Sequence, residues 1–221
     1  MFGPWKVSSW RIASICVIAV CPPEIAAACE SGVRIDEVLA DPAAGVEGDA
    51  NGDGARHTYE DEFVEILNLG PTQVDLAGWR LGDDDTSIAS WFEFPSASRL
   101  RPGTRALVFG GGTPTGFTAP AFVDDGRLGN GLSNSGDVLF LIDAAGDTID
   151  SVSNAAWPAD QSIARSRQNC DDFLFHSHPP GRGERFSPGT PRAILDSISL
   201  EPADTTVEIG ARFSMRSVML R

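Results

Sequence analysis

Residues 62–81 read EFVEILNLGPTQVDLAGWRL, and this stretch decides the fold class. Successive side chains of an extended chain point to opposite faces, so Val64 and Ile66 share one face of a strand. The Asn-Leu-Gly-Pro sequence at 68–71 ends that strand. A second alternating run follows and leads through Trp79 into a short strand. We therefore predict an all-β domain whose core contains Val64, Ile66 and Trp79.

The same stretch resembles a known family pattern, in which FVEL-N is followed by VDLSGW-L-D. A hairpin at 136–152 matches a second part of the pattern, and the strand at 33–40 with Asp41-Pro42 matches its opening. On these segments the chain resembles the lamin tail domain, an immunoglobulin-like β-sandwich of nuclear lamins and of many secreted bacterial proteins. The resemblance spans about residues 33–191 and implies an immunoglobulin-like β-sandwich. The matching residues are 33–42, 63–66, Asn68, 74–76, 78–79, Leu81, 136–152, 160–165 and 187–191.

Composition agrees with a globular all-β chain. Of the 221 residues, 42% are hydrophobic and 22% are charged, and 23 Gly with 15 Pro supply many turns. No segment between residues 33 and 191 has the 3.6-residue periodicity of an amphipathic helix. The chain is long enough for one domain with a core, plus flanking segments.

The net charge of −14 limits the possible partners. Binding to a phosphate backbone depends on Lys and Arg that release counterions, so this charge argues against a general nucleic-acid binder. An acidic surface is better suited to divalent cations or to cationic partners.

Residues 1–28 have the features of a signal peptide. Lys6 and Arg11 precede the apolar run 12–20, and three alanines at 26–28 provide small residues for cleavage before Cys29. A membrane-spanning helix needs about 20 apolar residues, so this run is too short to be one. We expect a secreted or cell-surface protein with no transmembrane segment in its mature chain.

Two cysteines, Cys29 and Cys170, remain after such a cleavage. An even pair in an exported chain indicates one disulfide, which would close a loop of about 140 residues and contribute about 4–5 kcal/mol on the chain-entropy model. The alternative is that residues 25–29 form a lipobox with a lipid on Cys29.

The domain boundaries follow from these features. We assign residues 29–192 to the sandwich domain. Residues 193–221 contain short alternating runs split by Pro202 and Gly210, and residues 197–210 resemble the opening of a bacterial Ig-like domain. Because 29 residues cannot bury a core of their own, we expect a truncated Ig-like start or a linker there.

A Gly- and Asp-rich insert at 43–61 contains a candidate calcium site. Its pattern D-x-N-x-D-G-x5-E has the spacing of a calcium loop, in which oxygen ligands surround one hard cation. Within it, Arg56 replaces the usual apolar residue, and the flanks are strands rather than helices. The alternative is a solvated acidic loop that simply makes turns. The predicted ligands are Asp49, Asn51, Asp53, the Ala55 carbonyl and Glu60, with Asp61 or Glu62 as alternatives to Glu60.

Other polar clusters have weaker patterns. The run 83–85 of three aspartates is interpreted as a charged turn. His176 and His178 form an H-x-H pair without an evident third ligand, so we expect structural or solvent-facing roles. The triglycine 110–112 leads into Thr-Pro, which cannot begin a phosphate-binding helix.

These observations favour a non-catalytic interaction or adhesion module over an enzyme. No nucleophile motif or zinc-hydrolase motif is present. The alternative is a metal-dependent hydrolase, or an accessory of one, that uses the acidic insert. The expected partner is a surface or extracellular protein or polysaccharide, and calcium is the expected structural cofactor.

Overall fold

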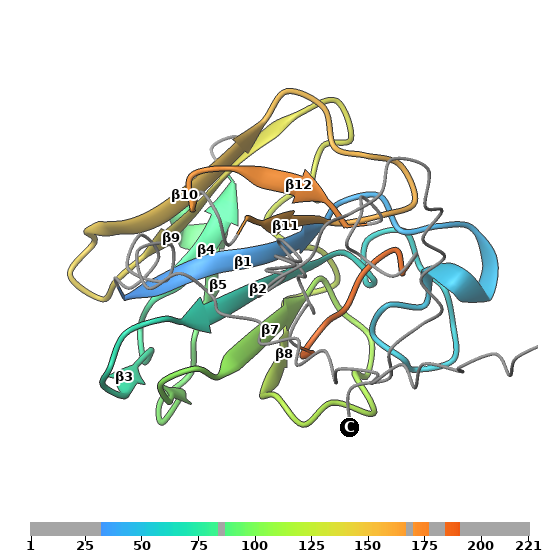
Figure 1. Ribbon diagram of the computed structural model, residues 1–221. Coiled ribbons are helices and arrows are strands. Elements are labelled where there is room, and N and C mark those ends of the chain that lie inside the picture. The colour runs from blue at the N-terminus through green and yellow to red at the C-terminus, as the bar shows by residue number, and fades with distance from the viewer. Residues whose placement is uncertain (1–31, 84–86, 167–169, 177–183, 191–221) are drawn as a thin grey trace, which may run out of the picture. The chain divides into compact units, whose positions relative to one another are not determined.

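The computed structural model describes residues 32–83, 87–166, 170–176 and 184–190, and in these ranges the chain is built from strands with two short 3-10 helices (Figure 1). A six-stranded sheet and a four-stranded sheet form a sandwich, and a two-stranded ribbon lies beside them. The predicted immunoglobulin-like β-sandwich is confirmed. The elements are β1 (Val33–Leu39), η1 (Gly45–Gly48), β2 (Phe63–Asn68), β3 (Val74–Asp75), β4 (Arg80–Asp83), η2 (Ile88–Ser90), β5 (Phe92–Glu93), β6 (Arg99–Leu100), β7 (Arg105–Phe109), β8 (Ala121–Val123), β9 (Asp137–Ile142), β10 (Thr148–Asn154), β11 (Ile163–Arg165) and β12 (Phe173–Phe175).

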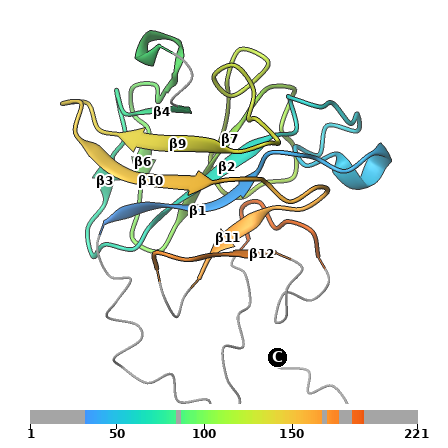
Figure 2. The same ribbon diagram turned by 90° about the horizontal axis from the view of Figure 1, so that it is seen from above.

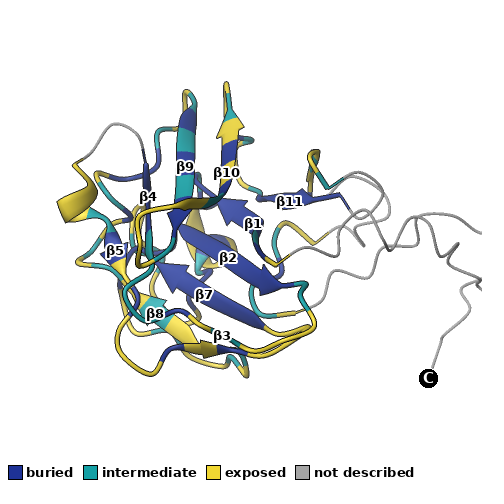
Figure 3. Ribbon diagram, turned by 90° about the vertical axis from the view of Figure 1, so that its left-hand side faces the viewer, coloured by how far each residue is buried: buried dark blue, intermediate teal, exposed yellow. Residues whose placement is uncertain are grey.

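The six-stranded sheet has the order β12-β11-β1-β2-β7-β8, and only the β7–β8 pair is parallel. Strands β2 and β7 are buried along their whole length (Figure 3). Complete burial means that both faces of this sheet are covered, which explains why these strands contain apolar residues at consecutive positions. One face packs on the four-stranded sheet, and the other lies under loops.

Strand β1 contains a β-bulge between Ile35 and Glu37. The bulge adds one residue to the strand and reverses the alternation of side chains beyond it. Val33 and Ile35 therefore lie in the core between the sheets together with Val38, whereas Leu39 packs on the outer face. A strict period of two over 33–40 would have placed Val38 outside.

The core between the two sheets contains Val64 and Ile66, both fully buried. Trp79, which was predicted in the core, packs against it and is partly rather than fully buried. Its N–H donates to the Leu76 carbonyl at 2.9 Å, in a turn directly before β4 begins. Of the tryptophans in the described ranges, Trp157 is the one buried in this core, 5% exposed.

The four-stranded sheet has the order β10-β9-β4-β5. Strands β9 and β10 form the predicted hairpin, with β9 in the interior of the sheet. The outward residues of β9, Val138 and Phe140, are partly buried. Segment 87–91, with η2 and Trp91, provides part of this cover.

The outer face of the six-stranded sheet has its own small apolar cluster. Leu39, Phe63 and Phe109 form it with Ala50 of the acidic insert and Phe186 of the C-terminal described segment. Figure 2 shows the insert, with η1, at one end of the strands. The insert is therefore joined to the domain by apolar packing as well as by polar contacts.

Several predictions lie outside the described residues, namely the signal peptide at 1–28, Cys29, His178, Asp84, Asp85 and the tail at 193–221. The disulfide between Cys29 and Cys170 accordingly stays a prediction. In the part of the chain that is described, no helix has the length and apolarity that crossing a membrane requires.

Candidate functional site

The acidic loop 49–55 curls around its own polar side chains. Asp49 Oδ2 accepts the Gly54 N–H at 2.9 Å, and Asn51 Oδ1 accepts the Asp53 N–H at 3.0 Å. Asp53 Oδ1 accepts the Ala55 N–H at 2.9 Å. The contacts of Asn51 and Asp53 are Asx turns, in which a side-chain oxygen accepts the N–H two residues further on. The contact of Asp49 with Gly54 spans five residues and closes the loop into a compact turn.

One oxygen in this loop has no hydrogen-bond partner among the described residues. Asp49 Oδ1 is buried from solvent and accepts no hydrogen bond from them, although burying an unsatisfied carboxylate oxygen costs free energy. A cation would satisfy it. Among the described residues no group of three or more His, Cys, Asp or Glu is placed to hold a metal ion. A site here would therefore need the Asn51 amide oxygen and backbone carbonyls in addition to Asp49 and Asp53.

The three acidic residues that could close the loop have different roles in the structure. Asp61 is fully buried and accepts the N–H groups of Asn51 at 3.0 Å and His57 at 2.6 Å, so it anchors the loop backbone. Glu62 faces the opposite side and accepts the Leu132 N–H at 3.0 Å. Glu60 is partly exposed, and no hydrogen bond to its carboxylate is found in the described ranges. Of the three, Glu60 therefore has the carboxylate most available for a cation.

The triglycine after β7 is the platform on which the insert docks. A Cβ at Gly110 would lie 1.9 Å from the Tyr59 carbonyl oxygen, and one at Gly112 would lie 2.3 Å from Asn51 Nδ2. Gly112 also has a φ of +76°, which favours glycine. Asn51 Nδ2 donates to the Gly111 carbonyl at 3.3 Å. The glycines are needed because the loop packs directly on the backbone.

Arg56, which departs from the calcium-loop pattern, has a structural role. Its Nε donates to the Ala43 carbonyl at 2.9 Å, and its Nη2 donates to the Pro42 carbonyl at 2.6 Å. Arg56 thus ties the middle of the insert back to its beginning. The sequence pattern contained no signal for this contact.

A second polar cluster lies under the segment Glu184–Thr190, which we call the closing strap. Glu37 Oε1 accepts the Ser187 N–H at 2.8 Å, and Glu65 Oε2 accepts the Gly189 N–H at 2.7 Å. Both carboxylates are buried. Residues 187–191 match the family pattern in the sequence, but the docking of the strap on Glu37 and Glu65 was not predicted.

Burial affects the protonation of these carboxylates. Desolvation, together with the neighbouring Asp36 and Glu37, raises the pKa of Glu65 to about 9, although Arg105 at 2.6 Å lowers it. Desolvation likewise raises the pKa of Glu62 to about 8. These groups are therefore structural carboxylates whose charge depends on pH.

A histidine and a serine also meet in this cluster, at His176 and Ser187, with Nε2 and Oγ 2.8 Å apart. The arrangement differs from a hydrolytic triad because His176 Nδ1 faces the Glu184 carbonyl at 2.9 Å rather than a carboxylate. Both side chains are also buried, 1% and 8% exposed. The predicted structural role of His176 fits this position.

The outward face of the four-stranded sheet has an aromatic pair. The rings of Trp91 and Phe140 are parallel to within 5°, with centroids 6.0 Å apart. Trp91 lies against Gly82, where a Cβ would be 2.2 Å from the indole. Phe140 pairs with Gly82 on one side and Ser151 on the other, so these residues share one face. Ser151 is exposed.

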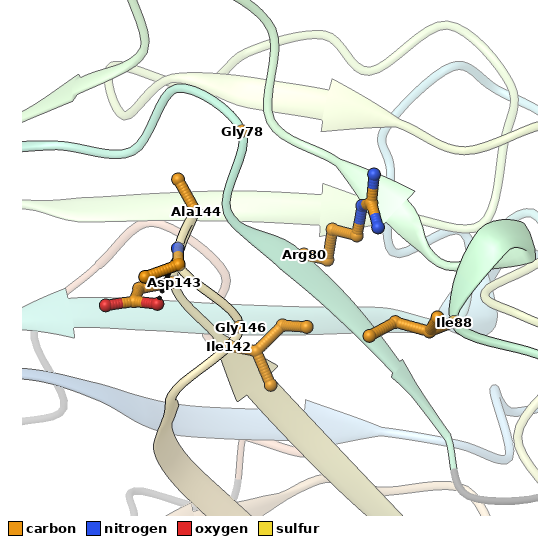
Figure 4. A pocket seen from close by; sticks show the side chains of 8 residues that line it. Gly78, Arg80, Ile88, Ile142, Asp143, Ala144 and Gly146 are labelled. Atoms are coloured by element: carbon orange, nitrogen blue, oxygen red, sulfur yellow. Dashed lines mark hydrogen bonds between the residues drawn. The ribbon is translucent and has the colours of Figure 1, made fainter.

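Beside this face lies a shallow hollow between the β9–β10 turn and η2 (Figure 4). The side chains of Ile88 and Ile142 point toward each other there. The Asp143 carboxylate accepts N–H groups of its own turn, from Ala145 and Asp147 at 2.9 Å each. Arg80 pairs with Glu93 at 2.7 Å. The polar groups of the hollow are thus already paired.

Comparison with known proteins gives one result for the family. The family model described as Lamin Tail Domain matches residues 26–156. The match covers β1 to β10, including the acidic insert and the aromatic pair, and ends before β11 and the closing strap. No curated protein matches the chain.

Proposed function

Since the chain belongs to the lamin tail domain family, we propose that it is an exported, non-catalytic binding module, stabilised by calcium, that acts at the cell surface or outside the cell. The lamin tail domain is an immunoglobulin-like module, and modules of this kind generally bind partners rather than catalyse reactions. The carboxylates that could serve a hydrolase, such as Asp61 and Glu62, accept backbone N–H groups within the fold. Residues 1–28 support export by their basic start, short apolar run and small residues before Cys29.

Calcium is the proposed structural cofactor, held by the loop 49–60. The residues that would hold it are Asp49, Asn51, Asp53, the Ala55 carbonyl and Glu60. The observation that supports this fit is the buried Asp49 Oδ1 without a hydrogen-bond partner. Bound calcium would neutralise carboxylates of the loop and restrain an insert of about 20 residues. Extracellular calcium loops bind with dissociation constants as weak as about 10⁻⁴–10⁻³ M, which suits an exported protein.

The outward face around Trp91 and Phe140 is the proposed binding surface, and a neutral polysaccharide is the proposed partner. Aromatic rings stack on the C–H faces of sugar rings, and Trp91 and Phe140, stacked with their centroids 6.0 Å apart and each partly exposed, place two such rings on this face. The exposed hydroxyls of Ser151 and Ser153 lie on the same strand face and can bond sugar hydroxyls. The net charge of −14 disfavours an anionic polymer.

Co-sedimentation with insoluble neutral polysaccharides, in millimolar calcium or in chelator, tests this function. We expect Trp91→Ala and Phe140→Ala to weaken binding at least tenfold. Phe175→Ala is the matched control, because Phe175 is an aromatic residue that is 51% exposed on β12, in the other sheet. Equal binding by all three variants would refute the proposed surface. Failure of the unaltered protein to bind any neutral polymer, with capture of an envelope protein instead, would refute the proposed partner.

A further inference from the structure

The closing strap crosses the outer face of the six-stranded sheet and is held there by polar contacts. Ser187 is its central residue, since its N–H donates to Glu37 Oε1 and its hydroxyl contacts two ionisable groups. Ser187 Oγ lies 3.0 Å from Glu37 Oε2 and 2.8 Å from His176 Nε2. Phe186 adds an edge-on contact with Phe63, 6.3 Å between ring centroids.

These contacts form a chain of two hydrogen bonds that needs two protons, from Glu37 Oε2 through Ser187 Oγ to His176 Nε2. The Ser187 hydroxyl supplies one of them. The proton of neutral His176 cannot supply the other, because Nδ1 faces the Glu184 carbonyl, which can only accept. The second proton must therefore be a titratable one, located either on Glu37 or on His176 Nε2.

Both locations satisfy every contact. With the proton on His176, an imidazolium donates to Ser187, which donates to the Glu37 carboxylate. With the proton on Glu37, the carboxylic acid donates to Ser187, which donates to neutral His176. Without this proton, two acceptors face each other at about 3 Å in a buried site, which is unfavourable. His176 and Glu37 are 1% and 2% exposed, so water cannot relieve the conflict.

We propose that the closing strap is a proton-dependent latch, closed by one proton that Glu37 and His176 share through Ser187. Closing the strap requires this proton, so the strap loosens as pH rises. An unrestrained His titrates near about 6.5 and Glu near about 4.3, so above about pH 6.5 the open form has lost the proton. The closing equilibrium then falls about tenfold for each pH unit.

The surrounding charged groups are compatible with a net neutral latch. Asp36 precedes Glu37 on β1, Glu65 lies on β2, and Arg105 on β7 donates to both Asp36 and Glu65. On the strap itself, Arg185 is partly exposed and pairs with Glu47 and Asp160. Burial raises the pKa of Glu37, opposed mainly by His176, which agrees with a proton retained between these two groups.

Hydrogen exchange of the Ser187 and Gly189 amides tests the latch in the full chain. We compare the unaltered protein with Glu37→Gln between pH 6.5 and 8.5, after correction for intrinsic exchange rates. The Gln amide can donate to Ser187 without a titratable proton, so E37Q is expected to keep the strap closed. The protection of the unaltered protein should fall about tenfold per pH unit more steeply than that of E37Q. Equal slopes would overturn the proposal and assign the titration to another group such as Glu65.

An independent measurement covers the case in which E37Q does not fold. Nitrogen NMR of the His176 imidazole in the unaltered protein should show a proton on Nδ1 at every pH at which the strap is closed. A neutral ring with its proton on Nε2 alone would contradict the proton count and refute the latch.

Discussion

Replacing Asp150 with alanine should be among the most destabilising single changes in this domain. Asp150 lies on β10 of the four-stranded sheet, and its carboxylate reaches the bulge of β1 in the other sheet. Asp150 Oδ2 accepts the Ile35 N–H at 2.8 Å and Arg165 Nη2 at 2.5 Å, while Arg165 Nε donates to the Ile35 carbonyl at 2.7 Å. The buried ion pair of Asp150 and Arg165 thus provides hydrogen-bond partners for the N–H and carbonyl of Ile35 at the bulge.

The expected loss follows from what alanine leaves behind. Arg165 is 4% exposed by its side chain, so D150A leaves a buried guanidinium without its partner, which costs about 3–5 kcal/mol. D150A also removes the acceptor of the Ile35 N–H, and the range of about 3–5 kcal/mol includes the cost of this lost hydrogen bond. The contact with Arg34 adds little, because Arg34 is 33% exposed. A domain of ordinary stability, about 5–15 kcal/mol, would lose a large part of it.

Urea unfolding measures this loss, with Asp75→Ala as the matched control. Asp75 is an exposed strand aspartate whose carboxylate accepts one N–H, from Ala77 at 3.1 Å, so its loss should stay below about 1 kcal/mol. In a double-mutant cycle, D150A and R165A should be strongly non-additive. If the free energy of unfolding of D150A lies within about 1 kcal/mol of that of the unaltered protein, the ion pair does not stabilise the bulge as described.

Three further predictions concern the core, the platform and the pH dependence of stability. Ile66→Ala should lower the free energy of unfolding by about 2–5 kcal/mol, because Ile66 is fully buried. Ile88→Ala is the control and should change it by at most about 0.5 kcal/mol, because Ile88 is 46% exposed. Similar losses from both variants in urea unfolding would contradict the core assignment. Gly112→Ala should lower the free energy of unfolding by about 1–3 kcal/mol and make the insert more sensitive to limited proteolysis. Gly116→Ala is the control, because Gly116 also has a positive φ but has open space around it, and this variant should leave the insert protected. The pKa of Glu62 is raised from the ordinary 4.5 to about 8 in the folded protein. Its contribution to stability is therefore complete below about pH 4.5 and is lost as pH rises to about 8. The loss amounts to about 1.4 kcal/mol per pH unit. Glu62→Gln should remove this component, and an unchanged slope in chemical unfolding at a series of pH values would count against it.

Most of the sheet framework could be predicted from local sequence patterns. The strand at Val64 and the hairpin at 136–152 have apolar runs bounded by turn residues, and they form as predicted. The phase shift in β1 leaves a local trace, because the polar pair Asp36-Glu37 interrupts the alternation of residues 33–40. The contacts that satisfy the bulge could not be predicted, since Asp150 and Arg165 lie far along the chain.

The sites were less predictable than the strands. In the loop 49–60 the oxygen-bearing residues follow the spacing of a calcium loop, so a ligand set could be proposed from the sequence. The roles of Glu37 and Glu65 could not, since each carboxylate binds the closing strap more than 120 positions away. Trp79 was expected in the core, and it packs against the core while staying partly exposed.

Thermal unfolding in calcium and in chelator tests whether calcium stabilises this module. At a calcium concentration of 100 times Kd, binding to the folded state adds about 2.7 kcal/mol, which corresponds to a rise in Tm of about 5–10 °C. The doubly altered D49N/D53N protein should lose this rise, and D75N, altered at an exposed aspartate outside the loop, should keep it. A Tm that is the same in 10 mM calcium and in chelator would contradict the claim.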